Sequence, residues 1–199
     1  FSLRRFGGAV ADPARDLDWA ETVGHASPDF AAVPVKAEDT FLIAYTSGTT
    51  GRPKGVVHTH LGVQAKATAD FLLCLDLKRD DRHLWMTDMG WVMGPLTLLS
   101  VLLSGGTLVL AEGAPSMPGD PFRLLRIASD MEVTHMGIAP TLVRQFMMLD
   151  PAPLSGYDLA RLRVVASTGE PWSDDAWAWH FERICRRRAV PLNISGGTE

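Results

Sequence analysis

The strongest constraint on the fold is the regular alternation of short β-type runs and helical patterns that begins at Asp80. Short apolar runs bounded by glycine, proline or polar residues predict strands, whereas apolar residues three and four apart predict helices. Strands are predicted at 83–86, 107–110, 133–138, 162–166 and 190–194. Helices are predicted between them at 95–103, 121–130, 140–149 and 173–188, and earlier in the chain at 16–23 and 61–75.

This alternation predicts an α/β fold of three layers, in which a mainly parallel sheet carries helices on both faces. In such sheets ligands gather beyond the carboxyl ends of the strands, so the loops that follow strands are the candidate sites. Three loops are rich in small and polar residues: those that follow the apolar runs at 41–45, 162–166 and 190–194.

The first of these loops lies in the stretch 41–55, FLIAYTSGTTGRPKG. Its apolar start predicts a buried strand, and its glycines leave backbone N–H groups open to an anion. The hydroxyl groups of Thr46, Ser47, Thr49 and Thr50 and the cation of Lys54 suit phosphate oxygens. The common pattern G-x-x-x-x-G-K-[ST] is not met, because Pro53 and Gly55 occupy positions where it needs Gly and Ser or Thr. The stretch therefore predicts a polyphosphate site of another kind.

Two shorter motifs follow later strands, ASTGEP at 166–171 and SGGTE at 195–199. Either one alone is typical of a simple turn. In this order after YTSGTTGRPKG, they resemble the adenine-binding loop and the Gly-Thr-Glu motif of the adenylate-forming superfamily, which includes acyl-CoA synthetases, peptide-synthetase adenylation domains and luciferases. The run MTDMGWVMG at 86–94 is similar to the acetyl-CoA synthetase-like and medium-chain acyl-CoA synthetase branch.

The resemblance implies that the chain is part of the large domain of an adenylate-forming enzyme. Residues 1–36 are then a lead-in segment or linker, and 37–199 a partial AMP-binding domain. The N-terminal half of that domain and the C-terminal lid domain, with its catalytic lysine, are absent by comparison with the family. The isolated chain is therefore expected not to complete adenylation.

The resemblance also implies a reaction and its residues. A carboxylic acid attacks ATP to form an acyl-adenylate, and the acyl group then passes to the thiol of CoA. Lys54, Thr198 and Glu199 are the implied catalytic residues, with Glu199 as the ligand of Mg²⁺ and Thr198 at the α-phosphate. The implied nucleotide contacts are Thr46, Ser47, Gly48, Thr49, Thr50, Gly51 and Lys54 for the outer phosphates, Gly169, Glu170 and Pro171 against the adenine, and Asn193, Ser195, Gly196, Gly197 and Thr198 opposite them.

An acyl pocket is implied at Trp91, Val92, Met93, Thr168 and Gly196. In acetate-specific relatives the position that matches Gly196 carries a tryptophan that closes the pocket. Glycine at this position predicts an acid longer than acetate.

The composition is that of a globular protein, with 46% hydrophobic and 21% charged residues. A net charge of −4 and a pI near 5.9 give no reason to expect a nucleic-acid partner. The sequence has no apolar run long enough to span a bilayer and only two cysteines, Cys74 and Cys185, both expected to be structural thiols. These features predict a cytoplasmic location, and they do not indicate an oligomeric state.

Two alternatives remain open at this stage. An amino-acid adenylation domain would use an aspartate near Asp88 to bind the substrate amino group. A nucleotide-binding module without catalysis would keep the loops and lose turnover. Pyrophosphate release by the full-length protein with different acids distinguishes them.

Overall fold

The computed structural model describes residues 12, 14–46 and 51–198, and its contacts divide the chain into two units, Phe1–Val35 and Lys36–Glu199. Among the described residues of the first unit lies the short helix α1 (Trp19–Gly24). The Asp18 carboxylate accepts a hydrogen bond from the Glu21 N–H at 2.9 Å, which satisfies one of the unpaired amides of the first turn. The expected anchor of this segment, Trp19, is 47% exposed.

The second unit is built on a five-stranded sheet with the strand order β4-β3-β5-β6-β7. Every neighbouring pair in it is parallel, as the alternation of elements predicted. The strands are β3 (Arg82–Trp85), β4 (Thr107–Val109), β5 (His135–Gly137), β6 (Val164–Thr168) and β7 (Val190–Ile194).

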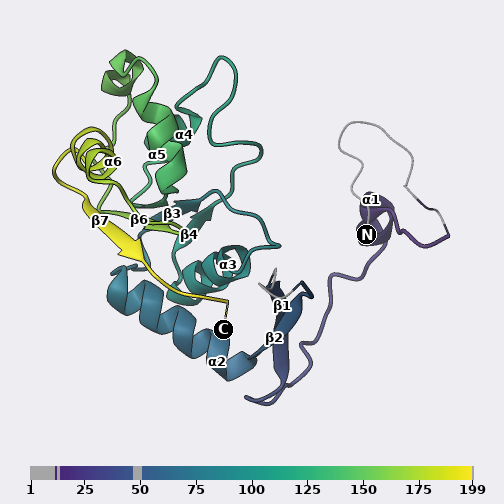
Figure 1. The fold of residues 1–199 in the computed structure, drawn as a ribbon. Coiled ribbons are helices and arrows are strands. Elements are labelled where there is room, and N and C mark those ends of the chain that lie inside the picture. The colour runs from purple at the N-terminus through teal and green to yellow at the C-terminus, as the bar shows by residue number, and fades with distance from the viewer. Residues whose placement is uncertain (1–11, 13, 47–50, 199) are drawn as a thin grey trace. The chain divides into compact units, whose positions relative to one another are not determined.

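Helices cover both faces of this sheet, so the predicted three-layer architecture is confirmed (Figure 1). One face carries α4 (Arg123–Asp130), α5 (Pro140–Met147) and α6 (Asp174–Trp179), and the other carries α2 (His60–Ala67) and α3 (Met93–Ser104). Along β6 the side chains alternate between the two resulting cores, since Val165 packs in the core under α4 and α5 while Val164 and Ala166 pack under α3.

Two of the helices continue as wider π-helical turns. α2 runs into Thr68–Cys74 and α6 into His180–Ile184. A 3₁₀ turn at Ala152–Gly156 follows α5. The sequence predicted single helices at 61–75 and 173–188, so it located these segments but not the change in their hydrogen bonding.

The prediction of a buried strand at 41–45 is wrong in one respect. β1 (Thr40–Thr46) is a strand, but it pairs in antiparallel fashion with β2 (Lys54–Thr59) in a separate two-stranded sheet. Its apolar side chains are largely exposed, and Tyr45 reaches 71%. An apolar run indicates that its side chains favour burial, but it does not indicate which other segment of the protein would cover them.

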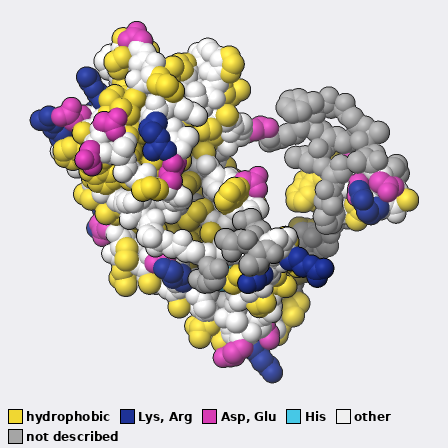
Figure 2. Space-filling model, in the orientation of Figure 1, with side chains coloured by type: hydrophobic (Ala, Val, Ile, Leu, Met, Phe, Trp, Pro, Cys, Tyr) yellow, Lys and Arg dark blue, Asp and Glu magenta, His cyan; other side chains and the backbone are white. Residues whose placement is uncertain are grey.

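The surface of the second unit mixes charges of both signs. On the face drawn in Figure 2, Lys and Arg side chains lie beside Asp and Glu side chains. Cys185 is buried, and burial raises the pKa of its thiol to about 12, whereas Cys74 is exposed and does not fit the expected role of a core thiol. Within the described residues, no helix combines the length and the apolar character that crossing a membrane requires.

Candidate functional site

The candidate site is the edge of the sheet where all five parallel strands end. Because the pairs are parallel, the segments after Trp85, Val109, Gly137, Thr168 and Ile194 leave the sheet on the same side. Two of the sequence motifs, 166–171 and 195–199, therefore begin at neighbouring strand ends. The described residues of both motifs lie at this edge.

The motif after β6 is tied to the motif after β7 by direct contacts. Thr168 is the register partner of Ile194, and the Thr168 hydroxyl donates to the Ile194 carbonyl at 2.8 Å. Gly169 then turns the chain with a φ of +95°, a conformation that glycine adopts without strain. These contacts place Gly169 and Ser195 just beyond a pair of hydrogen-bonded strand ends.

The side chain of Glu170 is engaged by the first turn of α5. The Thr141 N–H donates to a Glu170 carboxylate oxygen at 2.8 Å, and the Thr141 hydroxyl and the Arg144 guanidinium also donate to this carboxylate. The hydrogen bond from the Thr141 hydroxyl is the main cause that holds the pKa of Glu170 below its ordinary value, and Arg144 adds to it. Glu170 thus fastens the loop to α5.

Sequence reasoning missed both partners of Glu170. Pro140 marks the start of α5, so an unpaired N–H in the first turn at Thr141 could have been anticipated. Nothing local to Arg144 points to a glutamate 26 residues further along the chain.

A second network lies directly under the loop, around the hydroxyl of Ser167. The Trp172 indole N–H donates to this oxygen at 2.8 Å. The same oxygen is 3.2 Å from Asn193 Oδ1 and 3.3 Å from the Leu192 carbonyl. Neither Ser167 nor Trp172 was among the predicted site residues.

The loop after β3 and the segment after β4 enclose a cavity of about 430 Å³. The cavity is lined by Met86, Thr87, Asp88, Trp91, Ala111, Gly113 and Pro115. Of the residues predicted to form the acyl pocket, Trp91 lines this cavity, and its side chain is 73% exposed. Met93 instead begins α3 and packs against the core on that face, with Val92 as the preceding cap residue. Thr168 and Gly196 lie at the ends of β6 and β7 and do not line this cavity.

Asp88 makes a local contact that bears on the choice of substrate. One of its carboxylate oxygens accepts a hydrogen bond from the Gly90 N–H at 2.7 Å, which closes a short turn. This bond engages one carboxylate oxygen of Asp88, and the group keeps further acceptor sites.

The predicted phosphate-binding stretch begins on β1, which belongs with β2 to a separate two-stranded sheet and not to the parallel sheet. Thr46 and Lys54 are register partners on either side of the turn, and Gly51 has a φ of +94°. Ser47, Gly48, Thr49, Thr50 and Glu199 are outside the described residues. The Lys54 side chain makes no hydrogen bond or ion pair with another described site residue, and its role stays a prediction.

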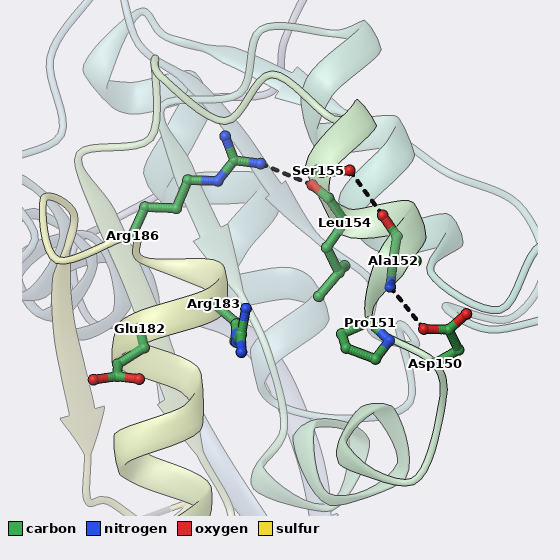
Figure 3. A pocket seen from close by; sticks show the side chains of 8 residues that line it. All are labelled: Asp150, Pro151, Ala152, Leu154, Ser155, Glu182, Arg183 and Arg186. Carbon is green, nitrogen blue, oxygen red and sulfur yellow. Dashed lines mark hydrogen bonds between the residues drawn. The ribbon is translucent and has the colours of Figure 1, made fainter.

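A separate cavity of about 500 Å³ lies between the 3₁₀ turn and the π-helical segment after α6. Figure 3 shows Arg183 pointing into the space beside Pro151, while Arg186 reaches the Leu154 carbonyl at 2.9 Å. Arg186 also donates to the Tyr157 carbonyl at 2.6 Å, so it fastens the turn to the rest of the protein. None of the predicted site residues lines this cavity.

Comparisons with known proteins give a consistent result. The model of the family "AMP-binding enzyme" matches residues 7–199. Acetyl-coenzyme A synthetase of Citrobacter koseri is 37% identical over 99% of this chain, and that of Rubrobacter xylanophilus is 39% identical over 99%. The chain spans about 30% of the length of these curated relatives.

Two solved structures are similar to this one. Acetoacetyl-CoA synthetase from Streptomyces lividans superposes with a TM-score of 0.84 at 31% identity, over 98% of this chain and 30% of its own. The luciferase-like enzyme of the mealworm Zophobas morio has a TM-score of 0.75 at 23% identity, over 92% of this chain and 40% of its own, and shows the shared fold.

Proposed function

This chain belongs to the AMP-binding enzyme family, and from that membership we propose that it is part of the large domain of an AMP-forming acyl-CoA synthetase. Residues 1–36 are the lead-in segment and 37–199 the partial AMP-binding domain. The observation that carries the proposal is the pairing of Thr168 with Ile194, which sets the two adenine-loop motifs side by side at the carboxyl edge of the sheet.

In the proposed reaction a substrate carboxylate attacks the α-phosphorus of ATP, pyrophosphate leaves, and the acyl group of the adenylate then passes to the thiol of CoA. No nucleophile of the enzyme is needed, because positioning and charge neutralisation account for most of the catalysis in such transfers. Lys54 would contribute one positive charge to the leaving pyrophosphate, and Thr198 would donate a hydrogen bond to the α-phosphate.

The adenine is proposed to lie between two walls. Gly169, Glu170 and Pro171 form one, and the segment from Asn193 to Gly197 forms the other. The bonds from Thr141 and Arg144 support this role for Glu170, since they hold its loop in a fixed place without using the backbone that faces the base.

Mg²⁺ is proposed as the counter-ion of the phosphates, with Glu199 as its protein ligand. Within the described residues there is no group of three or more His, Cys, Asp and Glu side chains that could hold a metal. A single carboxylate together with substrate phosphates is a common way to bind Mg²⁺, so the sequence motif fits this ion.

The proposed substrate is a carboxylic acid longer than acetate. A Cβ atom built on Gly196 meets no described neighbour within 4 Å, so the backbone at this position leaves room for an acyl chain beside it. One similar structure is an acetoacetyl-CoA synthetase, whose named acid is larger than acetate. We propose a cytoplasmic location, where ATP and CoA are available.

The test is pyrophosphate release by the full-length protein with ATP and Mg²⁺, across straight-chain, branched, aromatic and amino acids, followed by addition of CoA. Release with a carboxylic acid and formation of its thioester are expected. Lys54→Ala should reduce the rate strongly, while the matched change Lys36→Ala at another exposed lysine should not. Turnover with amino acids alone, or ATP binding without any turnover, would overturn the proposal in favour of the carrier-linked or non-catalytic alternative.

A further inference from the structure

The Ser167 hydroxyl lies at the base of the loop 168–171 and is almost fully enclosed, since the residue is 1% exposed. The Trp172 indole N–H donates to it at 2.8 Å. Ser167 precedes the loop and Trp172 follows it, so this one hydrogen bond closes the loop across its two ends. Such a closure restricts the conformations that the glycine-containing turn can adopt.

Trp172 is itself held by aromatic contacts. Its ring stacks on His180 with centroids 5.0 Å apart and an interplanar angle of 25°, and it meets Trp177 edge-on at 5.3 Å. Burial lowers the pKa of His180 to about 4, so this imidazole is neutral at pH 7. The indole therefore has a fixed position against α6 from which to donate.

The other contacts of Ser167 reach the opposite wall of the proposed adenine site. Its oxygen is 3.2 Å from Asn193 Oδ1 and 3.3 Å from the Leu192 carbonyl, both on β7. A hydroxyl has one proton to donate and two lone pairs to accept with. Because Trp172 supplies the accepted bond, the Ser167 proton is free to bind β7.

We propose that Ser167 and Trp172 are positioning residues that set the separation of the two adenine walls. Ser167 joins the loop of Gly169 to the strand of Asn193, and Trp172 fixes Ser167 by donating its indole N–H to the Ser167 hydroxyl. Neither side chain is assigned a contact with the nucleotide. The inference rests on the proposed function of this edge as an ATP site, and it adds the pair that holds that site in shape.

The experiment compares Ser167→Ala, Trp172→Phe and the double variant in the full-length enzyme. Each single change removes the indole–hydroxyl bond, and Trp172→Phe keeps an aromatic ring against His180. We expect each to raise the KM for ATP about fivefold, the effect of losing roughly one hydrogen bond, with the KM for the acid nearly unchanged. Ser167→Ala also removes the bond to β7, so it should raise the KM at least as much as Trp172→Phe does. The double variant should be little worse than Ser167→Ala alone, because Trp172 acts through Ser167.

Two further variants serve as controls. Ser167→Thr keeps the hydroxyl and should restore most of the affinity for ATP. Trp177→Phe alters the neighbouring aromatic contact but leaves the Trp172 N–H and Ser167 in place, so the KM for ATP should stay at the wild-type value.

The outcomes separate this inference from the proposed function. The inference about Ser167 and Trp172 would be overturned if the effects of the two single changes on the KM for ATP multiplied in the double variant. It would also be overturned if the variants lowered the melting temperature without changing the KM for ATP. If the wild-type protein turns over no acid, the proposed function fails first. ATP affinity measured by titration calorimetry then replaces the KM, with the same pattern expected among the variants.

Discussion

The indole of Trp85 lies against the Cα of Gly137, its register partner on the adjacent strand β5. A Cβ built at Gly137 would be 1.9 Å from the Trp85 ring, far inside the contact distance of two carbon atoms. The absence of a side chain at Gly137 therefore allows an aromatic ring to cover the sheet just before the loop of Trp91.

Gly137→Ala is expected to destabilise the protein by about 3 kcal/mol, because neither the backbone of a central strand nor a packed indole can move away easily. The apparent melting temperature of the full-length protein measures the loss. Gly156→Ala is the matched control, since a Cβ there meets nothing within 4 Å. Equal melting temperatures for the two variants would contradict the prediction.

A second prediction concerns Asp81, which is 4% exposed and lies 2.9 Å from the Arg163 guanidinium through both carboxylate oxygens. Burial acts to raise the pKa of Asp81, but the Lys78 N–H, Thr134, His135 and Arg163 together outweigh it, and the net pKa is lowered. The stabilisation of the folded protein by ionised Asp81 is thus complete above the ordinary pKa of an aspartate, and it is lost as the pH falls through the lowered pKa of Asp81.

Asp81→Asn should therefore lower the free energy of unfolding by about 2 kcal/mol at pH 7. The loss is smaller than for a fully buried ion pair, because Arg163 is partly exposed and keeps Asp76 as a partner. Stability measured by denaturant titration from pH 7 to pH 3 should fall less steeply in the variant. Asp80→Asn, at an exposed neighbouring aspartate, is the control. An unchanged pH dependence in Asp81→Asn would refute the assignment.

The layers of the fold could be predicted from the sequence because alternation is a local property. Val164, Val165 and Ala166 form a continuous apolar run, as a strand buried on both faces requires, and the structure places them alternately in two cores. The π-helical turns at Thr68–Cys74 and His180–Ile184 were missed. Over one or two turns, the spacing of apolar residues in a π-helix cannot be distinguished from that in an α-helix.

The candidate site was predicted only in part. The placement of both motifs at the carboxyl edge follows from parallel strands, which the sequence predicted, whereas the adjacency of β6 and β7 is known only from the structure. The hairpin of the predicted phosphate-binding stretch was missed, although the Gly- and Pro-rich turn between its strands is a local signal. The contact of Arg144 with Glu170 depends on tertiary packing, which leaves no local pattern. The roles of Lys54, Thr198 and Glu199 stay predictions.

A third prediction uses the contact of Arg144 with Glu170. Arg144→Met should loosen the loop, so that the backbone amides of Gly169, Glu170 and Trp172 exchange hydrogen faster in the full-length protein. In the wild type the same loosening should occur as the pH falls through the lowered pKa of Glu170, because the protonated carboxyl binds Arg144 weakly. Arg187→Met, which removes a surface pair with Glu182, should leave these amides unchanged. Equal exchange in all three proteins would show that Glu170 does not hold the loop.

The fourth prediction concerns the size of the acid. Gly196→Trp should place a large ring in the open space beyond β7, since a Cβ at this position meets no neighbour within 4 Å. Acids longer than acetate should then lose at least about tenfold in kcat/KM relative to acetate, while the KM for ATP changes little, because steric exclusion acts on the acyl chain. Gly196→Ala adds only a methyl group and should shift the preference slightly. If Gly196→Trp keeps the wild-type order of acids, the acyl chain lies elsewhere, and the cavity at Trp91 becomes the place to test next.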